Sequence, residues 1–195
     1  MTTLDHQELI DALTSGDDDR AEAAALALGR LGDAVLSNVC DLLPNADADV
    51  RWWATRTIGE IGTDAAIAAL IGQCVDPDPD VRACAIYALG TFGERAAVAV
   101  PALVQRLSDT SVYVGQLAAD SLARIGTGAT GPLIDALKSG TPAVRGRAAR
   151  ALAQLVDQAS IPALIESLGD ESPIVEYYAD IALQKMGVGT VLFKV

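Results

Sequence analysis

The sequence repeats itself with a period of about thirty residues, and this periodicity constrains the fold more than any other feature. The segment VRWWATRTIGEIG at residues 50–62 returns as VRACAIYALGTFG at residues 81–93, and weaker copies occupy most of the remaining chain. Repeats of this length are typical of proteins that stack one small helical unit many times. We therefore expect a series of similar units, with no catalytic chemistry.

The same residue types recur at the same places in every copy. The equivalents of Arg51 are Ala21, Arg82, Gly115, Arg145 and Glu176. Three residues after each of these six positions the chain carries Ala24, Ala54, Ala85, Ala118, Ala148 or Ala179, and seven residues after it Leu28, Ile58, Leu89, Leu122, Leu152 or Leu183. At about 100° per residue these positions share one stripe of a helix, which predicts a buried face.

Helix start and stop signals flank the repeated segments. Asp47–Val50 and Asp78–Val81 carry N-cap acids, the second with a first-turn proline, and Gly62 and Gly93 stand where the helices should end. A shorter apolar segment precedes each repeated one, and no stretch alternates with period two. The pattern predicts an all-α domain over residues 1–195, made of helix pairs at 4–32, 33–62, 63–93, 94–126, 127–156 and 157–187, with a tail at 188–195.

This pattern resembles the HEAT-like repeats of the phycobilisome-lyase type, which have an acid at the helix start, Val-Arg, spaced alanines, Leu-Gly and a final glycine. The resemblance covers residues 4–187 and is strongest in the second and third units. It implies an α-solenoid, a right-handed superhelix of about six helix pairs whose second helices line a concave surface. Bilin lyase subunits, deoxyhypusine hydroxylases and scaffold proteins all share such repeats, so the resemblance alone does not select a function.

Composition argues against several classes of partner. The chain has 26 acidic and 14 basic residues and a net charge of -12 at pH 7, which disfavours binding to nucleic acid or to anionic lipid. It shows no secretory segment and no apolar run long enough to span a membrane. Cysteines without a disulfide pattern suit a reducing compartment. We therefore expect a cytoplasmic protein that binds neither nucleic acid nor membrane.

The residues that most often carry chemistry are sparse. Deoxyhypusine hydroxylases hold two irons on paired His-Glu motifs, whereas the one histidine here, His6, precedes Gln7 and is expected on the exposed side of the first helix. Cys40 and Cys74 fall on Leu or Ile columns and should be core residues. A bilin-attaching or nucleophilic role for Cys84 would need an activating base that the sequence does not place nearby. We expect no enzyme activity, metal or cofactor.

Arginines follow the repeated valine in three units. We interpret Arg51, Arg82 and Arg145 as members of a ladder of ion pairs along the stack, although an anion-binding site is the alternative. The aspartates placed to serve as partners are Asp49, Asp80 and Asp109. Gly115 and Glu176 interrupt the ladder, so the fourth and sixth units are expected to be less stable.

The outer face of the second helices carries the residues expected to bind a partner. Tryptophan, tyrosine and arginine anchor protein interfaces because they combine a large contact area with a polar tip. The predicted binding residues are Trp52, Trp53, Arg56, Tyr87, Asp120, Arg147, Arg150 and Tyr177. Alternatively, Trp53 packs between helices, and Tyr177 with Tyr178 covers the C-terminal end.

The sequence thus predicts a non-enzymatic interaction or scaffold module that binds a protein or peptide on its concave face. The alternative is a subunit of a bilin lyase-like complex. We expect a monomer whose apolar tail, residues 188–195, folds back over the last pair; the tail could instead continue into a further repeat or mediate a dimer.

Overall fold

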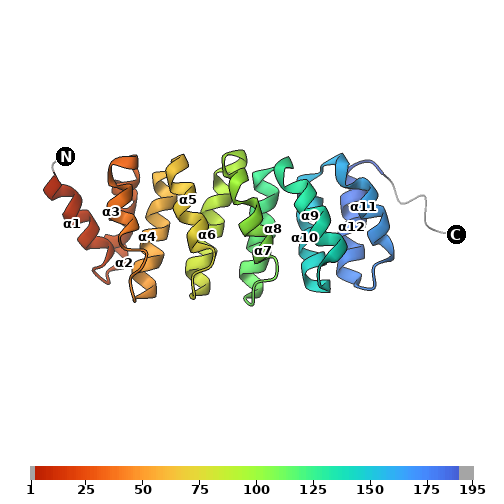
Figure 1. Cartoon of the computed structure of the whole chain (residues 1–195), viewed down its shortest axis with the longest axis horizontal. Helices are drawn as coiled ribbons and strands as arrows, with labels where there is room; N and C mark the ends of the chain where they lie inside the picture. Colours follow the sequence, from red (N-terminus) through yellow and green to blue (C-terminus); the bar gives the residue numbers. More distant parts are fainter. Residues whose placement is uncertain (1–2, 189–195) are drawn as a thin grey trace. The chain divides into compact units, whose positions relative to one another are not determined.

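The computed structural model describes residues 3–188 (Figure 1). Within that range the chain forms α-helices and short 3-10 helices and contains no strand. The twelve α-helices of the described range follow one another as six pairs, which confirms the prediction of an all-α stack of helix pairs. The chain divides into two compact units, residues 1–92 (unit 1) and 93–195 (unit 2), and each is described by itself. The expectation of a single domain stays a prediction.

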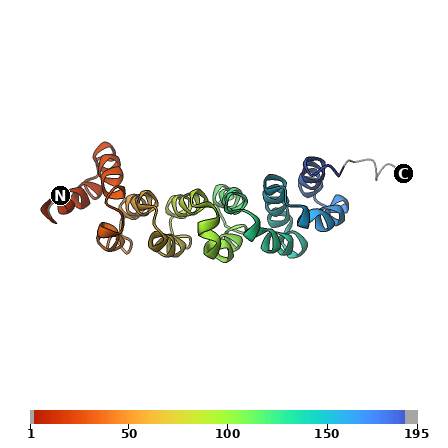
Figure 2. The same cartoon turned by 90° about the horizontal axis from the view of Figure 1, so that it is seen from above.

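Unit 1 contains the first three pairs. Its helices are α1 (Thr3–Leu13), α2 (Asp18–Gly29), α3 (Leu36–Cys40), α4 (Ala48–Ile61), α5 (Asp64–Gln73) and α6 (Pro79–Thr91), with the 3-10 helix η1 (Gly32–Val35) before α3. Each first helix packs against the second helix of its pair, and the second helices α2, α4 and α6 pack against one another in order. Figure 2 looks along many of these helices, so they appear as rings.

Unit 2 contains the other three pairs. Its elements are η2 (Gly93–Ala99), α7 (Val100–Arg106), α8 (Val112–Ile125), η3 (Thr127–Ala129), α9 (Thr130–Ser139), α10 (Pro142–Leu155), η4 (Gln158–Ser160), α11 (Ile161–Glu166), η5 (Ser167–Gly169) and α12 (Pro173–Lys185). The second helices α8, α10 and α12 again pack in order. Every first helix of this unit is preceded by a 3-10 turn.

The predicted stripe is the core of both units. All six alanines of the column are buried, and so are the six Leu or Ile residues seven positions after the Arg51-type position. Each buried Leu or Ile contributes about 1.5–3 kcal/mol relative to an exposed one. Alanine is small, so the second helices approach closely along this stripe.

The predicted start and end signals of α4 act as expected. The carboxylate of Asp47 accepts a hydrogen bond from the backbone N of Asp49 and so caps α4. Gly62 ends the same helix with a left-handed φ of 69°. The equivalent end of α10 is Val156, whose φ is 55°. A β-branched residue in this conformation is strained, because its Cβ crowds the backbone.

The arginine ladder exists, but Arg51 and Arg145 pair with acids other than the expected Asp49, Asp80 and Asp109. Arg51 makes a two-pronged contact with Asp76, at 2.8 Å from Nε and 2.9 Å from Nη2. Arg145 holds Asp170 in the same way, at 2.7 and 2.8 Å. In both cases the partner follows by 25 residues, since the side chain reaches the loop between the helices of the next pair. Asp49 takes no part in the contact.

Each ladder arginine also binds the loop before its own helix. Arg51 donates to the carbonyl oxygens of Asn45 and Ala46, at 3.0 and 3.2 Å. Arg82 donates to the carbonyl oxygens of Asp76 and Pro77, at 2.8 and 3.1 Å. Burial alone would raise the pKa of Asp76, but the hydrogen bond from Arg51 and the backbone N–H of Asp78 outweigh it and hold that pKa below its ordinary value. The ladder arginines therefore connect helices to the loops before them and to the loop of the next pair.

In the fourth pair, which lacks the ladder arginine, a side chain of the next pair occupies the vacant place. Gly115 stands where the second, third and fifth pairs carry the ladder arginine, and the guanidinium of Arg147 lies where a side chain at Gly115 would begin. Arg147 donates from Nη1 to the carbonyl oxygen of Leu107. A residue of the fifth pair thus occupies the space left by the missing side chain of the fourth.

Candidate functional site

The eight predicted binding residues divide equally between the units. Trp52, Trp53 and Arg56 lie on α4 and Tyr87 lies on α6, all in unit 1. The four in unit 2 lie on α8, α10 and α12 and are Asp120, Arg147, Arg150 and Tyr177.

In unit 2, contacts within the chain engage three of these residues. Arg150 pairs with Asp120 at 3.0 Å, and Gln154 donates to the same carboxylate at 2.7 Å. Arg147 binds the carbonyl oxygen of Leu107. The first two contacts join the second helices α8 and α10, and the third joins α10 to the end of α7. The role of Asp120, Arg147 and Arg150 in partner binding stays a prediction.

Tyr177 remains accessible. It is 57% exposed, and its ring meets that of Tyr178 edge to face with 5.3 Å between centroids. Tyr178 is half-buried. The predicted tail beyond residue 188 lies outside the described residues, so its relation to these rings stays a prediction.

In unit 1, the two tryptophans form a cluster on the outer face of α4. Their rings meet edge to face, with centroids 4.8 Å apart and planes at 89°. Both side chains are half-buried. Trp53 is therefore neither fully inserted between helices nor fully exposed, and Trp52 presents part of its ring to solvent.

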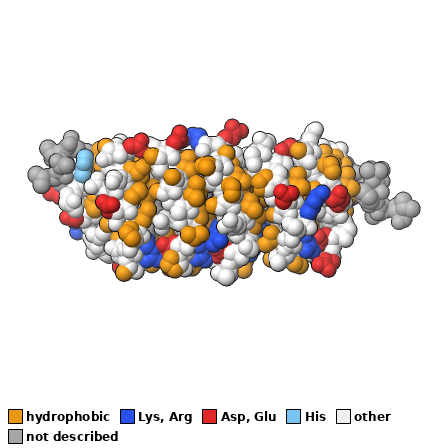
Figure 3. Space-filling model, viewed as in Figure 1, with side chains coloured by type: hydrophobic (Ala, Val, Ile, Leu, Met, Phe, Trp, Pro, Cys, Tyr) orange, Lys and Arg blue, Asp and Glu red, His pale blue; other side chains and the backbone are white. Residues whose placement is uncertain are grey.

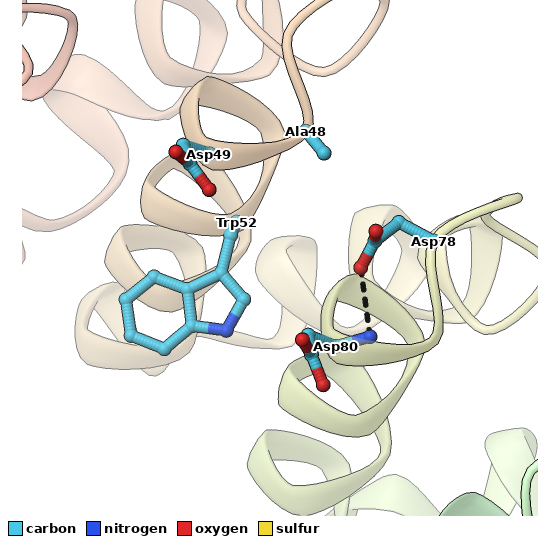
Figure 4. A pocket seen from close by; sticks show the side chains of 5 residues that line it. All are labelled: Ala48, Asp49, Trp52, Asp78 and Asp80. Carbon is cyan, nitrogen blue, oxygen red and sulfur yellow. Dashed lines mark hydrogen bonds between the residues drawn. The ribbon is translucent and has the colours of Figure 1, made fainter.

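A groove of about 310 Å³ lies between α4 and α6, beside Trp52 (Figure 4). We call it the α4–α6 groove, and it is lined by Ala48, Asp49, Trp52, Asp78 and Asp80. The Asp78 carboxylate accepts hydrogen bonds from the backbone N of Asp80 and Val81, at 2.8 and 3.3 Å, and so caps α6. Figure 4 shows the Trp52 ring on the α4 side of the groove, with Asp49 above it and its indole nitrogen on the side of Asp80.

A second groove of about 420 Å³ lies between α2 and α4, on the other side of Trp52. This α2–α4 groove is lined by Asp18, Asp19, Glu22, Asp49, Trp52 and Trp53. Asp49 and Trp52 line both grooves, so the Trp52 ring is their common wall. Every charged residue that lines either groove is acidic.

The acids of the two grooves lie at helix starts. On the face of the molecule drawn in Figure 3, hydrophobic side chains cover more of the surface than charged ones do. The six acids of the two grooves come from the first two turns of α2, the first turn of α4 and the start of α6. Negative charge near helix N-termini is favoured by the helix dipole, which accounts for part of this pattern.

A third groove of about 340 Å³ lies further along α4 and α6. It is lined by Arg56, Gly59, Glu60, Cys84, Tyr87, Ala88 and Thr91. Arg56 forms an ion pair with Glu60 on its own helix, and Tyr87 is 53% exposed. Burial raises the pKa of Cys84 to about 12, against the weaker opposing effect of Arg56, so its thiol is protonated at neutral pH and a poor nucleophile.

The other residues singled out in the sequence have simpler places. Cys74 is buried, as predicted. Cys40 is half-buried rather than a full core residue, and His6 is half-buried rather than exposed.

Among the described residues, no three or more His, Cys, Asp or Glu side chains are arranged to hold a metal ion. No helix of the described range has the length and apolar character to cross a membrane.

Sequence reasoning singled out Trp52 but not the acids around it. Asp49 and Asp80 were assigned to the arginine ladder, and Asp18, Asp19 and Glu22 to no site. The signal was present in the spacing, because Asp49 and Trp52 are three residues apart and therefore lie on the same face of α4.

Comparison with known proteins identifies the repeat. The family model for HEAT repeats matches residues 7–76, 71–132 and 130–192. The chain belongs to the HEAT repeat family. No curated protein matches it. The three HEAT-repeat matches together span nearly the whole chain, in agreement with the six helix pairs of the structure.

Solved structures with the same fold are repeat proteins. The HEAT repeats resemble the complex of CpcE and CpcF of phycocyanin lyase from Nostoc sp. PCC7120, with a TM-score of 0.62 and 21% identity over 77% of this chain and 99% of that one. A designed armadillo repeat protein in complex with the peptide (KR)4 has a TM-score of 0.52 and 19% identity, over 92% and 98% of the chains. An engineered protein has a TM-score of 0.54 and 23% identity, over 97% and 100%. At these identities the similarity establishes the α-solenoid fold alone.

Proposed function

We propose that this chain is a non-enzymatic binding module that holds a segment of another protein on the outer face of α2, α4 and α6. The observation that carries the proposal is the place of Trp52, a half-buried ring that forms the common wall of two grooves. Tryptophan is the residue type most enriched at the energetic centres of protein interfaces, since a partner can bury its large ring and bond its N–H.

The character of the grooves favours a peptide over a small molecule. Pockets for small ligands are mostly apolar, with a few polar groups, whereas these grooves combine tryptophan with several carboxylates. They lie between successive parallel-stacked helices, a surface that suits an extended segment crossing them. The peptide complex of a designed armadillo protein with the same fold supports this choice by analogy.

We take the protein to act as a cytoplasmic monomer.

The test is a selection of peptides from a random display library on the purified protein. The chain has two tryptophans, both at this surface, so their fluorescence reports binding directly. We expect the selected peptides to change the tryptophan emission and to bind Trp52→Ala at least about tenfold more weakly. Tyr113→Ala, which removes an exposed ring from α8 of unit 2, is the matched control and should leave affinity unchanged. Equal binding to Trp52→Ala, or no enriched peptide, would contradict the proposal.

The second candidate is a subunit of a bilin lyase-like complex, favoured by the similarity in fold to CpcE and CpcF. The purified chain would be mixed with a bilin and an apo-phycobiliprotein, alone and with host extract. A covalently coloured product that depends on the chain would support this candidate. The binding-module proposal predicts none.

A further inference from the structure

We infer that the α2–α4 and α4–α6 grooves bind an extended basic peptide, with one arginine side chain on each side of Trp52. This inference rests on the proposed function and names the chemistry of the partner. It combines three properties of the same surface: its charge, its aromatic wall and the spacing of its two grooves.

The negative charge of the two grooves favours a cationic ligand. Six acids line the two grooves, and within the described residues none of Asp18, Asp19, Glu22, Asp49 and Asp80 forms an ion pair with a basic side chain. By contrast, Asp120 of α8 in unit 2 pairs with Arg150. Clustered carboxylates repel one another, and a bound guanidinium would relieve that repulsion through charge-assisted hydrogen bonds.

Helix capping explains only part of this arrangement. Asp78 serves as the N-cap of α6, and acids in the first turns of α2, α4 and α6 interact favourably with the helix dipoles. Capping does not require a tryptophan among the acids. It does not account for Glu22 either, which lies beyond the first turn of α2.

The Trp52 ring independently favours a cation over other ligands. The face of an indole attracts Lys and Arg side chains through its quadrupole, and Arg also stacks flat on it. The edge-to-face contact with Trp53 holds the ring in place. A guanidinium in either groove can therefore contact the ring and a carboxylate together. Among the described residues the acids do not form a metal-binding group, which leaves an organic cation as the fitting ligand.

The two grooves fit alternate residues of an extended chain. They lie on opposite sides of one helix, α4, and neighbouring helix axes in packed structures are about 8–10 Å apart. Residues i and i+2 of an extended peptide point the same way and are about 6.6–6.8 Å apart along the backbone. Long arginine side chains can splay to bridge the difference. The expected ligand is an Arg-X-Arg segment that crosses α4.

The test uses the peptide Gly-Ser-Arg-Ser-Arg-Ser-Gly with a fluorescent label and measures anisotropy and tryptophan emission with the full chain at low salt. We expect saturable binding, and weakening of about fivefold or more on replacing either arginine by uncharged citrulline. A lysine version should bind more weakly than the arginine version, because lysine lacks the planar fork.

Variants of the chain separate the grooves from general charge attraction. Asp49→Asn and Asp80→Asn should each weaken binding by about threefold to tenfold, and Trp52→Ala by at least as much. Glu176→Gln removes an exposed acid from the first turn of α12 in unit 2 and should change nothing. Circular dichroism would confirm that all variants stay folded, since the capping residues Asp47 and Asp78 are unchanged.

Two results would overturn the inference. One is absence of binding to the wild-type chain; the other is binding that Asp49→Asn, Asp80→Asn and Trp52→Ala leave intact, which would reflect the net charge alone. Failure of this inference can be distinguished from failure of the proposed function. If library selection yields peptides that need Trp52 but lack basic residues, the binding module stands and the preference for arginine falls.

Discussion

Arg150 of α10 and Arg56 of α4 occupy equivalent positions, six residues after the repeated valine, yet they are used differently. Arg150 reaches Asp120 on the neighbouring helix α8, whereas Arg56 pairs with Glu60 on its own helix. In unit 2, the outer residues Arg150 and Asp120 thus join neighbouring helices. Unit 1 keeps its outer acids around Trp52 without such pairs, which leaves them available to a partner. The same repeat can therefore either pair its outer polar residues within the chain or leave its outer acids without ion pairs.

The comparison predicts that the ladder acid Asp76 supports stability much more than the groove acid Asp49 does. Asp76→Ala removes the partner of Arg51, whose side chain is only 11% exposed, against 4% for Asp76. Leaving a buried guanidinium unpaired should lower the free energy of unfolding by about 3 kcal/mol. Asp49→Ala, in the grooves of the same unit, should cost about 0.5 kcal/mol or less. Urea denaturation of both variants measures this difference, and equal losses would remove the distinction.

A second prediction concerns how the two units end their second helices. Unit 1 ends α4 with Gly62, and unit 2 ends α10 with Val156, both in the left-handed region. Val156→Gly should relieve strain and raise the free energy of unfolding by about 1 kcal/mol. The reverse change, Gly62→Val, should lower it by a similar amount or more. Thermal melts of both variants test the pair, and a destabilised Val156→Gly would show that contacts of the valine outweigh its strain.

The smallest expected effect sharpens the contrast between the arginines. A double-mutant cycle on Arg150 and Asp120 should give a coupling energy of about 0.5–1 kcal/mol, because both side chains are partly exposed. The cycle on Arg56 and Glu60 should give about 0.3–0.5 kcal/mol, as for a pair four residues apart on one helix. Chemical denaturation of the single and double variants supplies both values. A stronger coupling in unit 1 would contradict the proposed difference between the surfaces.

Local pattern was sufficient to predict the fold. The alanine column, the Leu or Ile column and the helix-ending glycines lie within one repeat, where a periodicity of 3.6 residues and known capping rules fix their roles. The six pairs and the buried stripe follow from these residues alone. The place of Trp52 on the outer face of α4 follows in the same way, because its offset from the repeated valine sets its direction.

Contacts between repeats could not be predicted with equal success. Arg51 bonds Asp76, 25 residues away, and Arg147 binds the carbonyl oxygen of Leu107, 40 residues away. These partners depend on how far a long side chain reaches across a loop, which no periodicity encodes. The groove acids were missed for a related reason: each has a sufficient local role at a helix start, and only packing of three helices brings them together around Trp52.

The guanidinium lodged over Gly115 carries an evolutionary consequence. In a solenoid of interchangeable modules, units could be duplicated, deleted or permuted freely, but this glycine and Arg147 complement each other across a module boundary. Copying the fifth module elsewhere in the array would drive its arginine against an existing side chain, and removing it would leave a hole above the glycine. The fourth and fifth helix pairs therefore depend on being adjacent, and we expect them to be inherited together.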